Sequence, residues 1–347
     1  MGEPIRGRAP LARPRIGIVG CGTVGAVHRD RLLAEPVDIV AVCDPDANAL
    51  SRMAASLPRR PRLFRSEQDL IVAGVVDAVV LCTPHARHAA QIRTALDAGV
   101  HVLCEKPFVT DAQVAGDLVA KAREESLALF VAFTRRSRGH ARFLIEAARQ
   151  IGPIRNVIFT RAQPWFQRHR RTWRMHEDEG GGFLLDAGAS LLDLLLRFIP
   201  STVEDIDAVL YRPAEAMGLD VDIQSSIRLG FTNGARAELI LIGDSTEQVE
   251  RIQLFGEGGS AGWLLRQGSP HDLYIRRSDP EGEPGAGMAE VGDPHPYRTL
   301  SPDTAFVAAL CSGDAAGDVA DNDLYSAVGA IPVVDLVQRI YREAKWR

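Results

Sequence analysis

The chain has 347 residues, which is long for one hydrophobic core and favours two domains. Hydrophobic residues make up 46% and charged residues 24%, as is normal for a soluble globular protein. The net charge of −5 gives no basic field for nucleic acid or an anionic membrane surface. No apolar run reaches the roughly 18 residues that span a bilayer, so we expect neither nucleic acid nor membrane as a partner.

The N-terminus and the cysteines indicate where the protein works. Residues 1–14 carry Arg and Pro but no apolar segment, so we expect a disordered lead-in and not a signal peptide. The five cysteines show no CxxC spacing and no even framework, and four of them lie in or beside apolar, strand-like runs. We interpret them as buried free thiols of a reducing cytoplasm. They are Cys21, Cys43, Cys82, Cys104 and Cys311.

Residues 15–135 alternate short apolar runs with segments of helical spacing, such as 86–98 and 111–125. Strands that alternate with helices predict βαβ units, and therefore a doubly wound parallel sheet with helices on both faces. The predicted strands are Ile16–Val19, Ile39–Cys43, Val76–Cys82, His101–Cys104 and Leu127–Ala132.

In residues 136–347, strand-like runs follow one another with turns between them, which predicts an α+β domain with a mostly antiparallel sheet. Asn233-Gly234 between two strand-like runs is a strong hairpin signal. An apolar helix is expected over 184–198, a long surface excursion over 266–300, and a closing helix over 323–343 that Pro332 kinks or restarts. The predicted strands are 154–160, 206–211, 223–231, 235–242, 248–255 and 259–265.

A glycine motif, GxGxxG, follows the first predicted strand and opens a helix. Its glycines allow a tight turn, a close approach of the backbone to a pyrophosphate, and close packing of helix on strand. The helix N-terminus offers free N–H groups and its positive dipole end to the phosphates. With the strand before it and the helix after it, the motif predicts a dinucleotide site rather than a plain glycine-rich turn. Its residues are Gly20, Cys21, Gly22, Thr23, Val24 and Gly25.

Asp44 ends the next strand, 19 residues after Gly25. A carboxylate at this place accepts hydrogen bonds from the adenine-ribose hydroxyls and repels a 2′-phosphate. Pro45 and Asp46 supply no cation, although Arg52 could still swing in. We therefore expect NAD as the cofactor, with NADP possible.

Glu105-Lys106-Pro107 follows the strand 101–104, and ligands of open parallel sheets lie beyond the carboxyl ends of the strands. Only three lysines occur, against 37 arginines. A lysine amine can titrate whereas an arginine effectively cannot, which favours a chemical role for Lys106 over a solvated surface charge.

A glycine-rich loop, Gly180-Gly181-Gly182, runs into the predicted helix 184–198. Asp186, Ser190 and Asp193 are spaced i, i+4, i+7 and should share one helix face. Two carboxylates on a helix of leucines need polar partners or a wet cleft, which favours an active-site face. The alternative is an N-terminal cap by Asp186 with Asp193 on the surface.

The segment Trp165–Arg174 contains two tryptophans, His169 and four arginines, Arg168, Arg170, Arg171 and Arg174. Trp faces stack on sugar rings, and Arg forks bind carboxylate, phosphate or hydroxyl groups. For most of these arginines a solvated loop is the better interpretation. The candidates for substrate binding are Ser190, His176, Arg135, Arg161 and Trp173.

Together these pieces resemble the glucose–fructose oxidoreductase / inositol dehydrogenase / MocA (Gfo/Idh/MocA) family, over nearly the whole chain from Arg15. The resemblance rests on residues 17–25, on 80–84 with His88, on 98–107, and on the helix that carries Asp186. It implies a Rossmann domain and an open-faced sheet domain, with a sugar, cyclitol or related polyol between them. It implies a homodimer or homotetramer as well. The cofactor contacts are expected from Gly20, Gly22, Thr23, Val24, Gly25, Asp44, Thr83, Pro84, His88, Glu105 and Lys106.

By this resemblance Lys106 polarises the reacting oxygen and Asp186 completes the catalytic pair, without a metal. The family's His, four residues after the Asp, is replaced by Ser190. Serine does not titrate near pH 7, so either Lys106, Asp186 or His176 moves the proton, or dehydrogenase activity is lost. The leading hypothesis is an NAD(P)-dependent dehydrogenase or reductase of CH–OH groups. The alternatives are a non-catalytic sensor that binds dinucleotide or sugar, and a redox-neutral enzyme with tightly held NAD.

Overall fold

A computed structural model describes residues 9–212, 219–266, 272–278, 289–291, 301–313 and 325–347. The chain forms two compact units, 1–134 with 300–334, and 135–299 with 335–347. The second unit therefore begins at Arg135, and residues 301–313 and 325–334, which the sequence pattern assigned to the second domain, pack in the first. No helix in the described ranges has the length and apolar character needed to cross a membrane.

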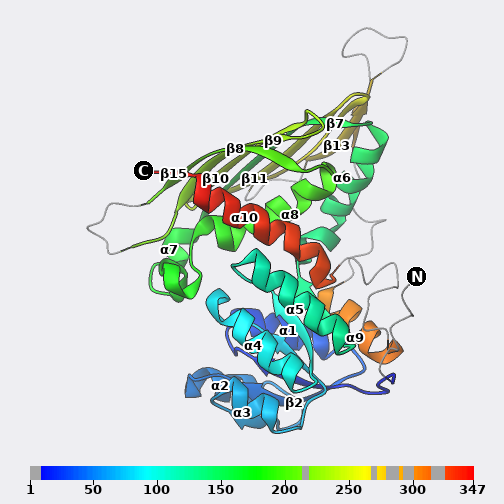
Figure 1. The fold of residues 1–347 in the computed structure, drawn as a ribbon, viewed down its shortest axis with the longest axis vertical. Coiled ribbons are helices and arrows are strands. Elements are labelled where there is room, and N and C mark those ends of the chain that lie inside the picture. The colour runs from blue at the N-terminus through cyan, green and yellow to red at the C-terminus, as the bar shows by residue number, and fades with distance from the viewer. Residues whose placement is uncertain (1–8, 213–218, 267–271, 279–288, 292–300, 314–324) are drawn as a thin grey trace. The chain divides into compact units, whose positions relative to one another are not determined.

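The first unit is built on a six-stranded parallel sheet of order β3-β2-β1-β4-β5-β6 (Figure 1). The central strands are buried along almost their whole length, as expected of a parallel sheet with helices on both faces. The strands are β1 (Arg15–Val19), β2 (Asp38–Cys43), β3 (Arg62–Phe64), β4 (Ala78–Leu81), β5 (His101–Glu105) and β6 (Leu129–Ala132). The helices are α1 (Thr23–Leu32), α2 (Ala47–Ala55), α3 (Glu67–Val72), α4 (His88–Asp97), α5 (Ala112–Glu124) and α9 (Pro302–Ser312).

The second unit contains a nine-stranded mixed sheet of order β14-β13-β12-β11-β7-β10-β9-β8-β15. Only β7–β10 and β8–β15 pair in parallel. Helices α6 (Gly139–Gln150) and α8 (Ala189–Phe198) pack on one face of it (Figure 1). The strands are β7 (Ile154–Pro164), β8 (Val203–Tyr211), β9 (Gln224–Phe231), β10 (Arg236–Ile242), β11 (Asp244–Gly256), β12 (Gly259–Arg266), β13 (Asp272–Arg277), β14 (Ala289–Val291) and β15 (Lys345–Trp346).

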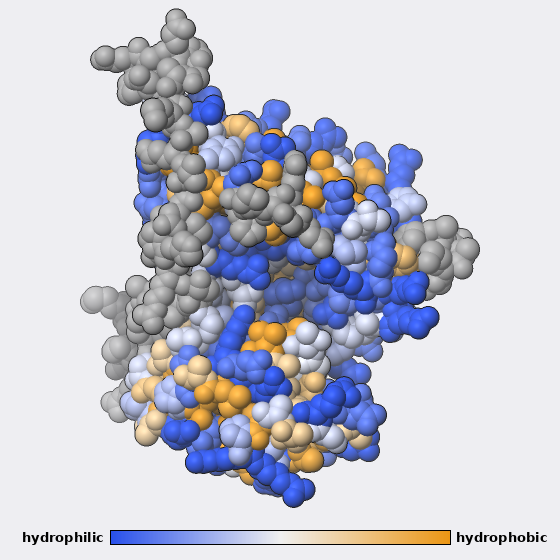
Figure 2. Space-filling view, turned by 180° about the vertical axis from the view of Figure 1, so that it is seen from behind, coloured by the Kyte–Doolittle hydropathy of each residue, from blue (hydrophilic) through white to orange (hydrophobic). Residues whose placement is uncertain are grey.

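The hairpin signal at Asn233-Gly234 is confirmed, since β9 and β10 pair in antiparallel fashion around it. Burial alternates along both strands, so that one face of each packs inside and the other is open to solvent. Polar and apolar side chains are interspersed on the surface that Figure 2 shows. Among the large apolar residues of the strands, Tyr211, Ile240 and Phe255 are exposed.

Several expectations need correction. Residues 9–14 are not a disordered lead-in, because the Leu11 N–H donates to the Leu310 carbonyl and Arg13 donates to the Val37 carbonyl. Residues 1–8 lie outside the described residues. The surface excursion expected over 266–300 contains two further sheet strands, β13 and β14, and its other residues from 267 onward are largely not described.

The closing helix is shorter than its pattern suggested. A 3₁₀ turn over Ala327–Ala330 precedes α10 (Ile331–Glu343), and Pro332 stands in the first turn of α10, where its missing N–H costs no hydrogen bond. Pro332 therefore marks the start of a new helix, α10, and not a kink within a longer one. Residues 314–324, which include the first two residues of the expected helix, lie outside the described residues.

Candidate functional site

The glycine loop lies at the carboxyl end of β1, in the middle of the first unit's sheet. Gly20 has φ +96°, and a Cβ there would stand 2.5 Å from the Cys82 carbonyl oxygen. A Cβ on Gly25 would stand 2.0 Å from the Gly20 carbonyl oxygen. These two glycines are thus required by the fold itself, which brings β1, β4 and the start of α1 together.

Gly22 is different. A Cβ on Gly22 would meet no atom within 4 Å, so nothing in the protein itself demands a glycine there. It precedes Thr23 and Val24, which open α1, and no side chain caps that helix end. An exposed glycine beside uncapped N–H groups fits a phosphate that approaches the backbone, which is how a dinucleotide is held in this fold.

Asp44 lies at the same edge of the sheet. One carboxylate oxygen accepts a hydrogen bond from the Cys21 N–H at 2.7 Å, and the other accepts one from the Asp46 N–H at 2.9 Å. The carboxylate is therefore fixed beside the glycine loop. The exposed Arg65 donates to the Pro45 carbonyl at 2.9 Å, so the residue after Asp44 is bound by a cation that sequence spacing did not suggest.

The segments after β4 and β5 are tied together by His88. Its Nδ1 lies 3.0 Å from the Pro107 carbonyl oxygen, and its Nε2 lies 3.1 Å from the Thr83 carbonyl oxygen. The ring is fully buried and its pKa is lowered by that burial. His88, which was expected to contact the cofactor, thus links the segment after β4 to the segment after β5.

Lys106 directly follows β5, and the Lys106–Pro107 peptide bond is cis. Strand β5 pairs with β4, which pairs with β1, so Lys106 and the glycine loop share the carboxyl edge of one sheet. The Lys106 N–H donates to the Glu105 carboxylate at 3.0 Å. The Lys106 side chain is half-buried.

Glu105 belongs to a buried group of three that sequence reasoning missed. Its carboxylate lies 3.1 Å from His28 Nε2, and His28 Nδ1 lies 2.6 Å from the Asp303 carboxylate. Burial by itself would lower the pKa of His28, but the two carboxylates outweigh it and raise the pKa to about 9. The segments that carry these residues are far apart in sequence, so no local signal could have linked them.

In the second unit the polar residues of the predicted helix do not follow one regular helix. Residues Leu184–Gly188 form a π-helical turn, and α8 begins only at Ala189. Asp222 accepts a hydrogen bond from the Leu184 N–H at 2.7 Å, which is the capping role considered for Asp186. Gly182, with φ +110°, lets this carboxylate approach, because a Cβ there would stand 2.5 Å from Asp222 Oδ1.

Asp186 is buried and held by two donors. Trp165 Nε1 donates to its Oδ2 at 2.7 Å, and Arg174 Nε donates to the same oxygen at 3.0 Å. Arg174 therefore does not belong to a solvated loop, whereas Arg168, Arg170 and Arg171 are exposed as expected. Both of these bonds go to Oδ2 of Asp186, and a carboxyl group held in this way can orient a hydroxyl group.

Ser190 and Asp193 are also buried, each beside an arginine. Arg135 Nε donates to Ser190 Oγ at 3.3 Å, while Ser190 Oγ donates to the Ala187 carbonyl at 2.9 Å. Arg136 forms a bidentate pair with Asp193, with 2.6 Å from Nε to Oδ2. Asp193 is therefore neither a surface residue nor open to substrate, and it serves the packing of α8.

The remaining candidates separate into two groups. Arg161 is part of a buried ion-pair cluster in which Glu250 accepts from both Arg135 and Arg161. Trp173 is half-buried under the Arg174 guanidinium, 4.4 Å from its ring centre, and His176 is exposed. Within the described residues, no group of three or more His, Cys, Asp or Glu side chains has an arrangement that could hold a metal ion.

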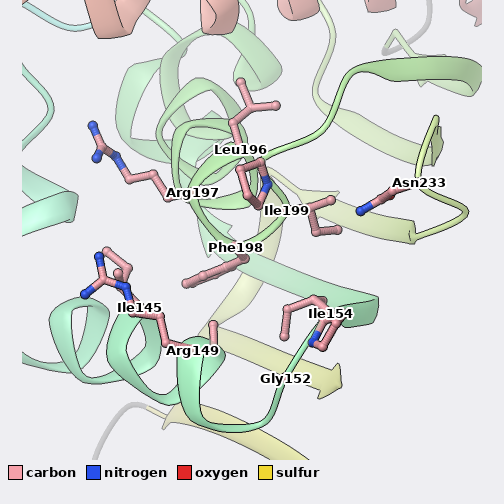
Figure 3. Close-up of a pocket in the computed structure, with 12 residues that line it drawn as sticks. Ile145, Arg149, Gly152, Ile154, Leu196, Arg197, Phe198, Ile199 and Asn233 are labelled. Atoms are coloured by element: carbon pink, nitrogen blue, oxygen red, sulfur yellow. The ribbon is translucent and has the colours of Figure 1, made fainter. Parts of the chain in front are cut away.

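A surface pocket of about 570 Å³ also belongs to the second unit, but it contains none of the candidate residues (Figure 3). It lies at the ends of α6 and α8 and at the β9–β10 turn. Its lining includes Ile145, Arg149, Gly152, Ile154, Leu196, Arg197, Phe198, Ile199 and Asn233.

Comparison with known proteins identifies the family of this chain. Residues 14–133 match the model of an oxidoreductase family with an NAD-binding Rossmann fold, and residues 140–262 match the Gfo/Idh/MocA C-terminal domain. The chain belongs to the Gfo/Idh/MocA family. It is an oxidoreductase whose first unit binds NAD(P), as the sequence resemblance implied.

Individual relatives of this Gfo/Idh/MocA protein are likewise named as oxidoreductases or reductases. A dTDP-3,4-didehydro-2,6-dideoxy-alpha-D-glucose 3-reductase of Streptomyces antibioticus is 27% identical over 97% of this chain and 99% of its own length. The uncharacterized oxidoreductase YrbE of Bacillus subtilis is 28% identical over 71% and 72%. The crystal structure of a 3-ketoreductase from Actinomadura kijaniata with NADP and TDP-benzene shares the fold, with a TM-score of 0.78, 24% identity, and 96% and 98% of the two chains covered.

Proposed function

We propose that this Gfo/Idh/MocA protein catalyses NAD(P)-dependent oxidation or reduction of a CH–OH group on a sugar, cyclitol or related polyol, including nucleotide-linked sugars. The observation that carries the proposal is Lys106 at the carboxyl edge of the sheet that holds the glycine loop. Relatives named as sugar-nucleotide reductases support the substrate class. When bound, the nicotinamide supplies or accepts the hydride.

The side chains of the protein bind the substrate, orient it and hold the proton. Lys106 donates a hydrogen bond to the reacting oxygen and holds its proton, because a lysine amine can titrate whereas an arginine effectively cannot. Asp186, whose side chain is held in place by Trp165 and Arg174, accepts a hydrogen bond from a substrate hydroxyl and orients it. Ser190 contributes a hydroxyl where the family's His is expected, and it moves no proton.

The preference for NAD over NADP is part of the proposal. The fixed Asp44 carboxylate would repel a 2′-phosphate, while Arg65 nearby reduces that repulsion. We expect NADH to bind more tightly than NADPH, and Asp44→Ala to narrow the difference. Tighter binding of NADPH to the natural protein would contradict the role given to Asp44.

A substrate panel tests the activity. Nicotinamide reduction or oxidation is followed at 340 nm with sugars, cyclitols and sugar nucleotides, in both directions. Lys106→Ala should lower kcat by about 10²–10⁴-fold and leave NADH affinity nearly unchanged. Lys121→Ala, which removes a lysine from α5, is the matched control. Equal turnover by the natural protein and Lys106→Ala would remove Lys106 from the chemistry.

One observation favours a second candidate, a sensor that binds dinucleotide and ligand without chemistry. Ser190 replaces a titratable residue, and its hydroxyl is already engaged with Ala187 and Arg135. A sensor would turn over no member of the panel at any pH, yet ligand would still raise its melting temperature in proportion to the logarithm of ligand concentration.

A further inference from the structure

Arg135 stands beside the position at which this chain departs from its family. Its Nε donates to Ser190 Oγ at 3.3 Å, and its Nη1 forms an ion pair with Glu250. The exchange of a larger imidazole for a serine therefore leaves a guanidinium next to the helix that carries Asp186. A guanidinium keeps its charge at every physiological pH and presents several donors in a planar fork.

The ion pairs around this helix are of two kinds. Arg136 pairs with Asp193, and Arg174 pairs with Asp186. Arg135 and Arg161, however, share one carboxylate, that of Glu250. Around Glu250, two guanidinium groups therefore share a single carboxylate.

Burial makes this sharing significant. The side chains of Arg135, Arg161 and Glu250 are only 10%, 17% and 6% exposed. Burial, together with repulsion by Arg135, lowers the pKa of Arg161 to about 10. Two buried guanidinium groups that share one carboxylate repel each other, so an anion that reaches both of them is bound favourably.

Arg161 also has an unused donor. Its Nη1 and Nη2 bind Glu250 and Gln163, but its Nε is buried and has no hydrogen-bond partner among the described residues. Asp186 and Arg135 both interact electrostatically with Arg161, so Arg161 lies near the proposed catalytic carboxylate.

We propose that Arg135 and Arg161 bind a carboxylate group of the substrate, so that this protein acts on an acidic sugar or polyol. The proposal rests on the proposed function, in which Asp186 and Ser190 face the substrate. Two guanidinium groups that already share one carboxylate match a monoanionic carboxylate better than the two charges of a diphosphate. Guanidinium forks bind carboxylates through charge-assisted hydrogen bonds.

The test uses ligand pairs that differ only by a CH₂OH or a carboxylate group: glucose and glucuronate, galactose and galacturonate, UDP-glucose and UDP-glucuronate. Affinity is measured by calorimetry on the full chain saturated with NADH. In at least one pair the carboxylate member should bind about ten- to a hundredfold more tightly, as expected for hydrogen bonds to a charged group. Equal affinity within all three pairs would overturn the proposal.

Two variants locate the effect. Arg135→Gln and Arg161→Gln should each reduce the carboxylate preference about tenfold or more, while the neutral member of each pair changes by less than about threefold. If one of these variants does not fold, the other alone tests the proposal. Arg168→Gln, which removes an exposed arginine, should retain the full preference. A preference that survives in both cluster variants would refute the role of Arg135 and Arg161.

The nucleotide pair separates carboxylate recognition from diphosphate recognition. If Arg135→Gln weakened UDP-glucose and UDP-glucuronate equally, the cluster would bind the diphosphate and the proposal would be wrong. Failure of the proposed function looks different: carboxylate selectivity in binding would persist without any turnover. Turnover of neutral polyols without carboxylate selectivity would retain the function and overturn this inference alone.

Discussion

Single residues at the two candidate sites differ in what the protein itself requires of them. Gly20 and Gly25 are glycines because backbone atoms stand where a Cβ would be. Gly22 has open space around it, so the only constraint on its side chain comes from a ligand. Replacing Gly22 by valine should therefore affect cofactor binding without affecting the fold.

We predict that Gly22→Val weakens NADH binding by at least about a hundredfold while the circular dichroism spectrum and melting temperature stay close to those of the natural protein, because the new side chain would occupy the path of the pyrophosphate. Fluorescence titration with NADH measures the loss. Gly116→Val is the matched control, since Gly116 also has open space around it but lies in α5. Unchanged NADH affinity in Gly22→Val would remove the glycine loop from the cofactor site.

Ser190→His tests the residue in which this chain departs from its family. An imidazole at position 190 would lie beside Arg135, whose positive charge should hold the pKa of the new histidine below its usual value of about 6.5. If the natural protein is an enzyme, its pH–rate profile should lack a histidine limb, and the variant should be no more active. A gain of polyol oxidation only in the variant would show that the natural protein has lost the chemistry.

At the scale of elements, His28 couples three segments of the first unit. It lies on α1, Asp303 lies on α9, and Glu105 ends β5 just before Lys106. The group joins the helix that begins at the glycine loop to the strand that carries the proposed catalytic lysine. His28 is thereby a positioning residue for the cofactor edge of the sheet.

The coupling should depend on pH. The pKa of His28 is about 9 in the folded chain and near 6.5 when unfolded, so its contribution to stability is complete below pH 6.5 and is lost as the pH rises through about 9. We predict that the melting temperature of the natural protein falls between pH 6.5 and 9 more steeply than that of His28→Gln. The variant should also have a lower melting temperature at pH 6.5. Parallel pH profiles for the two proteins would contradict a charged His28.

At the scale of the whole molecule, the first unit is completed by a distant part of the chain. Phe306 and Leu310 of α9 are buried in the same core as Ile18 and Val42, and Phe306 packs against Phe130 with ring centres 5.5 Å apart. Residues 9–134 alone would leave this apolar surface exposed to water. The Rossmann unit therefore needs the chain that follows the second sheet.

We predict that Phe306→Ala destabilises the first unit by about 3–5 kcal/mol, as expected when a buried phenyl ring leaves a cavity. Chemical unfolding followed with and without NADH measures this, because bound cofactor reports on the first unit. Val328→Ala is the control, since Val328 is 46% exposed and belongs to the same unit. Equal stability of Phe306→Ala and the natural protein would show that α9 is dispensable for the cofactor-binding unit.

The sequence by itself determined the features that depend on local pattern. Strand and helix periodicity predicted the parallel sheet and the antiparallel strands, because burial of one face or two imposes a characteristic spacing of apolar residues. The glycine motif with Asp44, and Lys106 at a strand end, followed from the edge at which parallel strands bind ligands. Asn233-Gly234 marked its hairpin because its glycine adopts φ +82°.

Only the tertiary structure decided which charges meet. Arg135 and Glu250 are 115 residues apart, and His28 and Asp303 are 275 residues apart. No spacing rule relates such residues, since their contact is created by the packing of whole elements. In the π-helical turn Leu184–Gly188, Asp186 and Leu184 likewise bind partners elsewhere in the chain, which are Trp165, Arg174 and Asp222. Local sequence fixes which side chains are available, and long-range packing fixes which of them become partners.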